Sequence, residues 1–505
     1  MDAAGRALAA ALGVRPTDRV RPPLDDPALG VDVPARPRRA WAHRLVVVGD
    51  SLTQGFQHYA VHATDLSWPA LVADRLGARF AHPVDRGPGG YPLNLELLAR
   101  RVLGRPAPAG LVAGYRYLRQ VERCYERPLP PGPGARHENL GVWGWDLRDV
   151  LSRTADTERA RVGPPGPSPL VDDAQARAAV QVLSGARDRA GRALGPLEAA
   201  QELGADPGGI ETLCVWLGSN NALGSVVRLD AVPSGPGFRD LTAKARYTVW
   251  TVEHFRAELE LLAARVERVD ADHVLWATVP HVTIPPVTRG LGGPLPGLPR
   301  YFRFYGRPWK SDRTFDPDRD RHLTGGQVWA VDLAVDEYNR ALVQVVERAR
   351  QAGRDWRVVD QGAVLDRLAV RRNDELEARP VEFPPWPLPA ELRDLDTRFF
   401  GTDEAGNRTR GGLFGLDGIH PTTCGYGIVA QEFTRAMHAA GVEFTAGPDL
   451  DFAALRRRDS LVRSPPPGLD AVLRRIDRWD QRLGVLRRWL PGRCGAAPAG
   501  AQAGA

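Results

Sequence analysis

Four short apolar runs, separated by helical patterns, limit most strongly what this chain can fold into. The runs lie in residues 45–48, 211–221, 273–280 and 356–361. Each is short and ends near a turn-forming residue, as expected for a buried strand. Residues 252–269, between the second and third runs, repeat large apolar side chains at steps of four and three, which indicates one face of a helix. Strands alternating with helices favour parallel pairing with helices on both faces, so the sequence predicts an α/β fold.

The chain of 505 residues is long for one domain, and we expect one large α/β domain that carries insertions. Residues 1–40 are predicted to form an N-terminal extension, residues 41–448 the main domain, and residues 449–505 a separate tail. Four long segments interrupt the main domain, at residues 100–136, 155–210, 285–325 and 370–410. Insertions of this kind usually lie in loops at the substrate side, and loops of this length are expected to contain short helices.

The composition is that of an ordinary soluble protein, with 43% hydrophobic and 25% charged residues. The net charge of +6 raises the question of a nucleic-acid partner. However, only Lys244 and Lys310 among the 67 cationic residues are lysines, and arginine is enriched along the whole chain. This bias is typical of a GC-rich genome, whereas a binding surface would concentrate its cations on one face. We therefore predict no nucleic-acid binding.

Neither the cysteines nor the apolar segments indicate a metal site, a disulfide framework or a membrane span. The four cysteines are dispersed and show no C-x-x-C spacing; they are Cys124, Cys214, Cys424 and Cys494. No apolar run approaches the length of a membrane span. The first sixteen residues lack a basic region before their apolar stretch and have no clear cleavage site, which makes them a poor secretory signal. We therefore expect an intracellular, cytoplasmic protein.

A serine stands where the first predicted strand stops. The segment Gly49-Asp50-Ser51-Leu52 follows the apolar run at residues 45–48 and precedes a weak helical pattern. Backbone N–H groups at the start of a helix have no partner within the helix. A serine at this junction either caps the helix or acts as a nucleophile, and this segment alone does not decide between the two.

Three further segments resolve that choice when they are taken with the first. They are ENLGVWGWDL, which holds Gly144; WLGSNNALG, which holds Asn220; and FGLDGIHPTTCGYG, which holds Asp417 and His420. Over residues 44–440, and in this order, the four blocks together resemble the SGNH, or GDSL, hydrolase family of esterases and lipases. The resemblance implies a three-layer α/β/α, flavodoxin-like fold with a five-stranded parallel sheet.

The family match implies a role for each of these residues, and ester chemistry supplies the physical reason. Ester hydrolysis needs a nucleophile, a base, a group that orients the base, and donors for the oxyanion. Ser51 would attack the carbonyl, His420 would take its proton, and Asp417 would orient the imidazole. The Ser51 N–H, the Gly144 N–H and the Asn220 side chain would form the oxyanion hole. No metal and no organic cofactor is required.

The sequence departs from the family pattern or leaves a choice open at several positions. Asn221 replaces the aspartate that commonly follows the family asparagine, which is expected to alter a supporting hydrogen bond. Gly141 competes with Gly144 as the oxyanion donor, and we prefer Gly144 because it stands five residues after Asn139, as in the family. Three other side chains are expected mainly to be packed, with a pocket or site role as the alternative; they are Trp143, Trp145 and Cys424.

The predicted function is therefore that of a serine ester hydrolase acting on a small-molecule or lipid ester. Acyl transfer to an acceptor other than water is an alternative, because the same groups would perform it. A binding protein that keeps the fold without activity is a second alternative, which the intact set of site residues disfavours.

The tail contains an amphipathic helical pattern over residues 469–490. Its apolar side chains form one stripe, made of Leu469, Val472, Leu473, Ile476, Trp479, Leu483, Leu486 and Leu490, with arginines on the other faces. We expect this stripe to dock on the protein or on a second copy, with an anionic membrane surface as the alternative.

Overall fold

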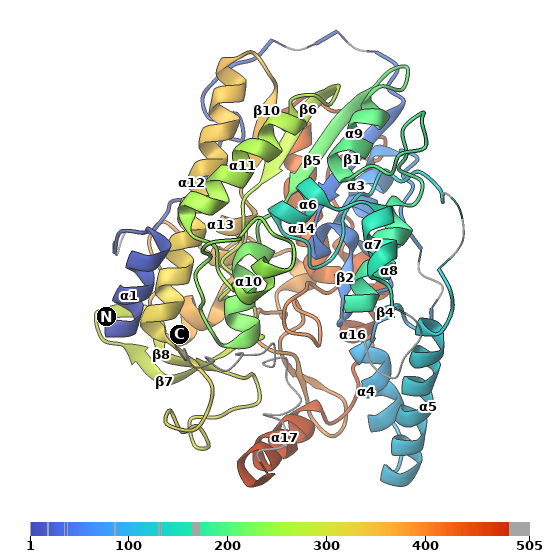
Figure 1. The fold of residues 1–505 in the computed structure, drawn as a ribbon. Helices are drawn as coiled ribbons and strands as arrows, with labels where there is room; N and C mark the ends of the chain where they lie inside the picture. Colours follow the sequence, from blue (N-terminus) through green and yellow to red (C-terminus); the bar gives the residue numbers. More distant parts are fainter. Residues whose placement is uncertain are drawn as a thin grey trace, which may run out of the picture.

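A parallel four-stranded sheet flanked by helices forms the centre of the molecule (Figure 1). The computed structural model describes residues 2–483, except residues 18–19, 35, 38, 85–86, 130–131, 133 and 164–171. The strands are β1 (His43–Gly49), β5 (Ile210–Trp216), β6 (Ala271–Ala277) and β10 (Trp356–Val359), and they lie in that order across the sheet. All three neighbouring pairs are parallel. The α/β class and the four strands predicted from the apolar runs are confirmed.

The five-stranded sheet implied by the family resemblance is not formed within the described residues. A fifth segment does run along the free edge of β1, but it makes only one isolated parallel bridge, between Val47 and Asn139. The Val47 N–H donates to the Glu138 carbonyl, and the Leu140 N–H donates back to the Val47 carbonyl, both at 2.9 Å. The Val142 N–H also donates to the Gly49 carbonyl at 3.1 Å, and the chain then turns into the loop that holds Gly144.

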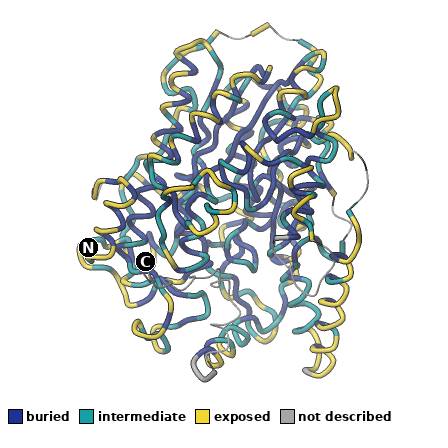
Figure 2. The backbone as a smooth tube through the Cα atoms, in the orientation of Figure 1, coloured by how far each residue is buried: buried dark blue, intermediate teal, exposed yellow. Residues whose placement is uncertain are grey.

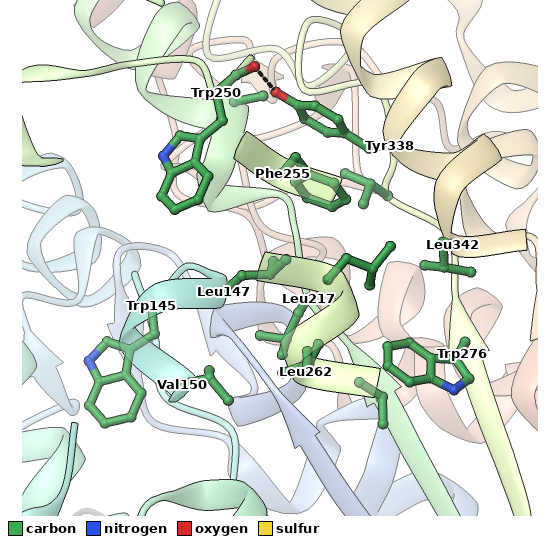
Figure 3. Packing of buried hydrophobic residues seen from close by; sticks show 14 of the residues in the cluster. Trp145, Leu147, Val150, Leu217, Trp250, Phe255, Leu262, Trp276, Tyr338 and Leu342 are labelled. Carbon is green, nitrogen blue, oxygen red and sulfur yellow. Dashed lines mark hydrogen bonds between the residues drawn. The ribbon is translucent and has the colours of Figure 1, made fainter. Parts of the chain in front are cut away.

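Alternate side chains of the strands enter two separate hydrophobic clusters, one on each face of the sheet. On β1, Val46 and Val48 join the cluster that contains α11 (Val252–Val266) and α12 (Gly325–Gln351), part of which Figure 3 shows. Leu45 and Val47 join the cluster that contains α3 (Trp68–Leu76) and α14 (Thr423–Ala439). Both faces of the strands are therefore buried, as the near-continuous apolar runs require (Figure 2).

The remaining helices connect or cover these elements. They are α1 (Ala3–Leu12), α2 (Ser51–Gln54), α4 (Leu95–Leu103), α5 (Ala107–Tyr125), α6 (Leu147–Ser152), α7 (Ala155–Arg161), α8 (Asp172–Leu183), α9 (Pro196–Gly204), α10 (Asn220–Arg228), α13 (Gln361–Leu368), α15 (Phe452–Arg458), α16 (Ser460–Arg463) and α17 (Leu469–Leu483). No helix among the described residues is both long enough and apolar enough to cross a membrane.

The long insertions contain secondary structure of their own. The first holds α5, the second holds α7, α8 and α9, and the third holds an antiparallel sheet of β7 (Arg289–Leu295), β8 (Leu298–Gly306) and β9 (Leu323–Thr324). The fourth holds the short hairpin of β11 (Gly401–Thr402) and β12 (Arg408–Arg410). A further small antiparallel sheet consists of β2 (Phe56–Gln57) and β3 (Ala60–Val61), which follow α2 in the sequence, and β4 (Tyr91–Pro92), which comes after α3.

The N-terminal segment packs against the main domain. In α1, Leu8, Ala9 and Leu12 are buried in the cluster that contains α12. The two helices approach so closely that a Cβ added to Gly5 would lie 2.5 Å from the Gly326 carbonyl carbon, so a glycine is required there.

The tail helix α17 contacts the main domain mainly through its aspartates. Asp470 pairs with Arg410 at 2.6 Å, and Asp480 pairs with Lys310 at 2.7 Å. Leu469 is buried, whereas Trp479 on the predicted apolar stripe is 65% exposed. Residues 484–490 of that stripe lie outside the described residues, and a contact with a membrane or a second copy stays a prediction.

Candidate active site

Ser51 lies at the first position of α2, directly after β1 ends. The Asp50 carboxylate accepts a hydrogen bond from the Leu52 N–H at 3.0 Å and so caps this short helix. A Cβ added to Gly49 would lie 2.0 Å from the Thr53 Oγ1, so only glycine allows the chain to turn this tightly. Because Asp50 provides the cap, the hydroxyl of Ser51 is free for another role, and its side chain reaches the candidate site.

Ser51, His420 and Asp417 form one hydrogen-bonded chain. The Ser51 Oγ lies 2.9 Å from the His420 Nε2, and the His420 Nδ1 lies 3.0 Å from the Asp417 Oδ2. Ser51 follows β1, while the other two residues precede α14, so the fold brings together groups that are 369 positions apart. The arrangement is that of a nucleophile, a base and the group that orients the base.

The Asp417 carboxylate is held in its charged form. It accepts hydrogen bonds from the N–H groups of His420 at 2.9 Å, Ile419 at 2.8 Å and Tyr59 at 2.7 Å. Burial alone would raise the pKa of this carboxyl, but the charge of His420 and these hydrogen bonds lower it to about 2. A carboxylate that stays ionised stabilises an imidazolium at His420 and fixes its Nδ1–H tautomer.

Two of the three expected oxyanion donors, Ser51 and Asn220, stand at the first positions of α2 and α10, and Gly144 lies in the loop before α6. Within the described residues, neither the Ser51 N–H nor the Gly144 N–H donates a hydrogen bond. Gly144 has a φ of 75°, a left-handed conformation that favours glycine. Asn220 begins α10, and its Nδ2 donates to the Trp145 carbonyl at 2.9 Å. An amide nitrogen has two hydrogens, so one remains for a ligand.

The hydrogen bonds favour Gly144 over Gly141 as the backbone donor. The Gly141 N–H donates to the Asn139 Oδ1 at 3.0 Å, and the Asn139 Nδ2 donates to the Thr53 carbonyl at 3.0 Å. Asn139 therefore ties this loop to α2 and occupies the Gly141 donor. The buried Asn221 side chain lies 3.5 Å from the Leu147 N–H, which places it behind the same loop.

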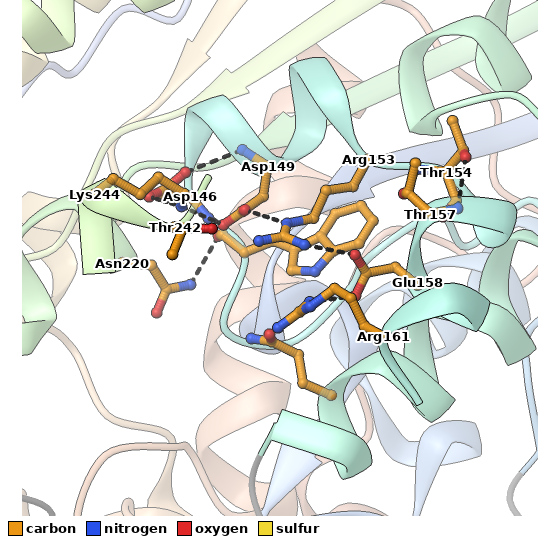
Figure 4. A network of polar contacts seen from close by, with 12 residues as sticks. Asp146, Asp149, Arg153, Thr154, Thr157, Glu158, Arg161, Asn220, Thr242 and Lys244 are labelled. Atoms are coloured by element: carbon orange, nitrogen blue, oxygen red, sulfur yellow. Dashed lines mark hydrogen bonds and ion pairs between the residues drawn. The ribbon is translucent and has the colours of Figure 1, made fainter. Parts of the chain in front are cut away.

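A buried polar network, which the sequence reasoning missed, holds the Gly144 loop (Figure 4). The Lys244 Nζ lies 2.5 Å from the Asp146 Oδ2 and 2.8 Å from the Asp149 Oδ2. Asp146 and Asp149 also cap α6 reciprocally. Asp149 in turn pairs with Arg153. The rarity of lysine in this chain was the one sequence signal that pointed to Lys244.

A second missed feature is the β2–β3 hairpin, which supports Asp417. Its two turn residues, His58 and Tyr59, have φ values of 51° and 66°, which are unusual for residues other than glycine. The His58 Nδ1 accepts a hydrogen bond from the Leu416 N–H at 3.1 Å, next to Asp417 in the sequence. The turn thus directs the Tyr59 N–H at the Asp417 carboxylate. No motif in the sequence indicated this contact.

An apolar pocket opens beside Ser51 and His420. Its walls come from several elements and include Leu52, Leu223, Val282, Val364, Leu413, Phe414, Ile419 and Ile428. Ser219 also lines this pocket. The predominance of aliphatic side chains suits a hydrocarbon portion of a ligand.

Trp143, Trp145 and Cys424 are packed and do not line this pocket. The Trp143 ring lies 5.2 Å from that of Phe56, which in turn lies 4.5 Å from the His420 ring. Trp145 is fully buried in the core cluster of α11 and α12. Cys424 is also buried, and desolvation raises the pKa of its thiol, which keeps it protonated and unreactive.

No protein-family model matches the chain, and no curated protein matches it.

Among the described residues, no group of three or more histidine, cysteine, aspartate or glutamate side chains could hold a metal ion.

Proposed function

We propose that this protein is a serine ester hydrolase of the SGNH type. The observation that carries the proposal is the contact of 2.9 Å between the Ser51 Oγ and the His420 Nε2, with Asp417 on the other ring nitrogen. The helices on both faces of the parallel sheet suit the three-layer fold of that family. The segment at Asn139, which lies where a fifth strand would pair with β1, makes only a single bridge.

The mechanism follows from the positions of these atoms. The Ser51 Oγ attacks the ester carbonyl carbon while its proton passes to the His420 Nε2. The carbonyl oxygen becomes an oxyanion, which accepts hydrogen bonds from the Ser51 N–H, the Gly144 N–H and the Asn220 Nδ2. His420 then gives the proton to the leaving alcohol, and the acyl group stays on Ser51. A water molecule, deprotonated by His420, releases the acid and restores the serine.

The apolar pocket indicates the class of ester. Aliphatic walls directly beside Ser51 favour an ester with a hydrocarbon group, because burying each CH₂ contributes about 0.8 kcal/mol. Acyl transfer to another acceptor would use the same first step and differ only in what replaces water.

The direct test is hydrolysis of nitrophenyl esters of increasing acyl length by the wild type and by Ser51→Ala. We expect kcat/KM of the variant to fall by at least about 1000-fold, because the acyl-enzyme cannot form. Ser219→Ala is the matched control, since Ser219 lines the same pocket but its hydroxyl forms no hydrogen bond with a histidine among the described residues. Equal losses in both variants, or none in Ser51→Ala, would contradict the proposal and favour a binding protein.

A further inference from the structure

A second cavity, which neither Ser51 nor His420 lines, is bordered by residues of the β7–β8 hairpin, of residues 371–375 and of α17. Figure 1 labels β7, β8 and α17. The cavity's volume of about 560 Å³ is sufficient for a small organic ligand. Five arginines line it: Arg289, Arg371, Arg398, Arg410 and Arg474. The tail helix contributes one wall, so a ligand here would contact both the main domain and α17.

The carboxylates that line this cavity are all engaged by other groups. Asp470 pairs with Arg410 at 2.6 Å, Glu375 with Arg398 at 3.7 Å and Asp477 with Lys310 at 3.9 Å, and Asp312 accepts a hydrogen bond from the Gly292 N–H at 2.6 Å. Lys310 lies outside the lining. None of these four carboxylates forms an ion pair with the other three arginines, although the charge of Glu375 still acts on Arg371.

Those three arginines have no carboxylate partner among the described residues. Arg289 and Arg474 form no ion pair there. The Arg371 guanidinium donates to the carbonyls of Thr288 at 2.5 Å and Ile284 at 2.7 Å, and to no carboxylate. Burial, together with the charges of neighbouring Arg372 and Arg289, lowers the pKa of Arg371 to about 10. Arg289 and Arg474 are exposed, whereas Arg371 is half-buried and lies close enough to Arg289 for their charges to repel, a repulsion that a bound anion would relieve.

Two further donors in the lining are buried without an acceptor. The Trp309 Nε1 and the Arg398 Nε both have no hydrogen-bond partner within the described part of the chain. Buried N–H groups are normally satisfied, and an unsatisfied one costs about 1 to 3 kcal/mol. The lining thus holds five arginines against four carboxylates, with one unused neutral donor at Trp309 and one unused charged donor at Arg398, while the Asp470 Oδ1 and the Asp477 Oδ1 also accept no hydrogen bond from the described residues. The excess of positive charge and the free donors suit an anion with several acceptor oxygens.

We propose that this cavity binds a phosphate group, held by Arg289, Arg371 and Arg474 with the Trp309 Nε1 as a neutral donor. A phosphate carries the charge and the number of oxygens that separated guanidiniums can bind together. Because Arg474 lies on α17, binding also ties the tail helix to the main domain. The site does not depend on the ester chemistry at Ser51.

The test is calorimetric titration of the full-length protein with pyrophosphate and with inorganic phosphate. We expect Arg289→Gln and Arg474→Gln each to weaken pyrophosphate binding by about tenfold, since each loses one charge-assisted contact. Arg303→Gln is the matched control, because Arg303 is an exposed arginine of β8 outside the cavity lining. No binding to the wild type, or equal weakening by the control, would overturn the proposal.

A free phosphate compound and a phosphate carried by the ester substrate share this chemistry, and kinetics distinguish them. For a substrate phosphate, Arg289→Gln raises KM for an ester of a phosphorylated alcohol but not for the same ester without phosphate. For a free ligand, the variant leaves both KM values unchanged and loses only the calorimetric signal. Failure of the ester hydrolase proposal would appear instead as the absence of turnover, with phosphate binding intact.

Discussion

Asp50 and Asp417 are both buried beside Ser51, yet their surroundings shift their pKa values in opposite directions. Asp417 accepts several backbone hydrogen bonds and faces His420, and its pKa falls to about 2. Asp50 accepts a hydrogen bond from the Leu52 N–H, and burial raises the pKa of its carboxyl to about 7. The number of donors and the nearest charge thus decide which carboxyl stays ionised.

Because of this raised pKa, the Asp50 carboxyl is expected to make the free energy of unfolding depend on pH. Below its ordinary pKa of 3.8 both the folded and the unfolded chain hold the proton. Between about pH 4 and 7 the unfolded chain loses the proton while the folded protein keeps it, so this group's contribution to the free energy of unfolding falls until about pH 7. Asp50→Asn keeps an acceptor for the Leu52 N–H without ionising. Urea unfolding at pH values from 4 to 8 gives the free energy of unfolding of both proteins. As the pH rises, the value for Asp50→Asn should increase relative to that of the wild type. If the two values keep a constant difference over this range, the prediction is wrong.

Asn220 is expected to act on the transition state more than on binding. Loss of one oxyanion donor typically costs about 100-fold to 1000-fold in turnover. Asn220→Ala should therefore lower kcat by that amount with little change in KM, measured on a small soluble ester. Because the Asn220 Nδ2 also holds the Trp145 carbonyl, circular dichroism of the variant should accompany the kinetics to show an intact fold. An unchanged kcat would mean that another group fills the oxyanion hole.

At the scale of elements, the Gly144 loop depends on a lysine from a distant segment. Lys244 bridges Asp146 and Asp149, which start the helix directly after the loop. The small ammonium group fits between two carboxylates, and Lys310 lies in a similar setting between Asp320 and Asp480. Both lysines of this arginine-rich chain are thus buried among aspartates.

Lys244→Met should therefore lower kcat, because the loop shifts and moves the Gly144 N–H away from the oxyanion. Asp146 loses its cation and Asp149 keeps only Arg153, and a shift of the loop is expected to lower kcat by about tenfold or more. Lys310→Met is the matched control, because it removes the other lysine that lies between two aspartates, far from the Gly144 loop in sequence. A similar loss of kcat in both variants would show a general effect on stability and remove Lys244 as a positioning residue.

At the scale of the whole molecule, Lys310 links the tail helix α17 to the main domain. Lys310→Met is expected to release α17, since Asp477 and Asp480 would lose their cation. Amide hydrogen exchange in residues 469–480 should then rise, while α14 stays protected and turnover of a small ester is retained. Unchanged exchange would mean that the remaining contacts, which include the burial of Leu469 and the Asp470–Arg410 pair, hold the helix without Lys310.

Local patterns predicted the parts of the fold that depend on neighbouring residues. The apolar runs gave all four strands, because burial on both faces leaves a visible signal, and the block with His420 placed Asp417 three residues away, within direct reach. Contacts between distant segments left no such signal. The edge segment at Asn139, the hairpin at His58 and the partners of Lys244 depend on register and packing. The tail was predicted to dock through leucines, whereas its aspartates make most of the polar contacts.

Covalent labelling with a fluorophosphonate, followed by mass spectrometry of peptides, tests the central claim most directly. The account predicts one adduct, on Ser51, formed quickly by the wild type and slowly by His420→Ala, because the nucleophile and its base act as one unit. No adduct should form in Ser51→Ala. An adduct on Ser219, or an unreactive Ser51 in the folded wild type, would contradict the account.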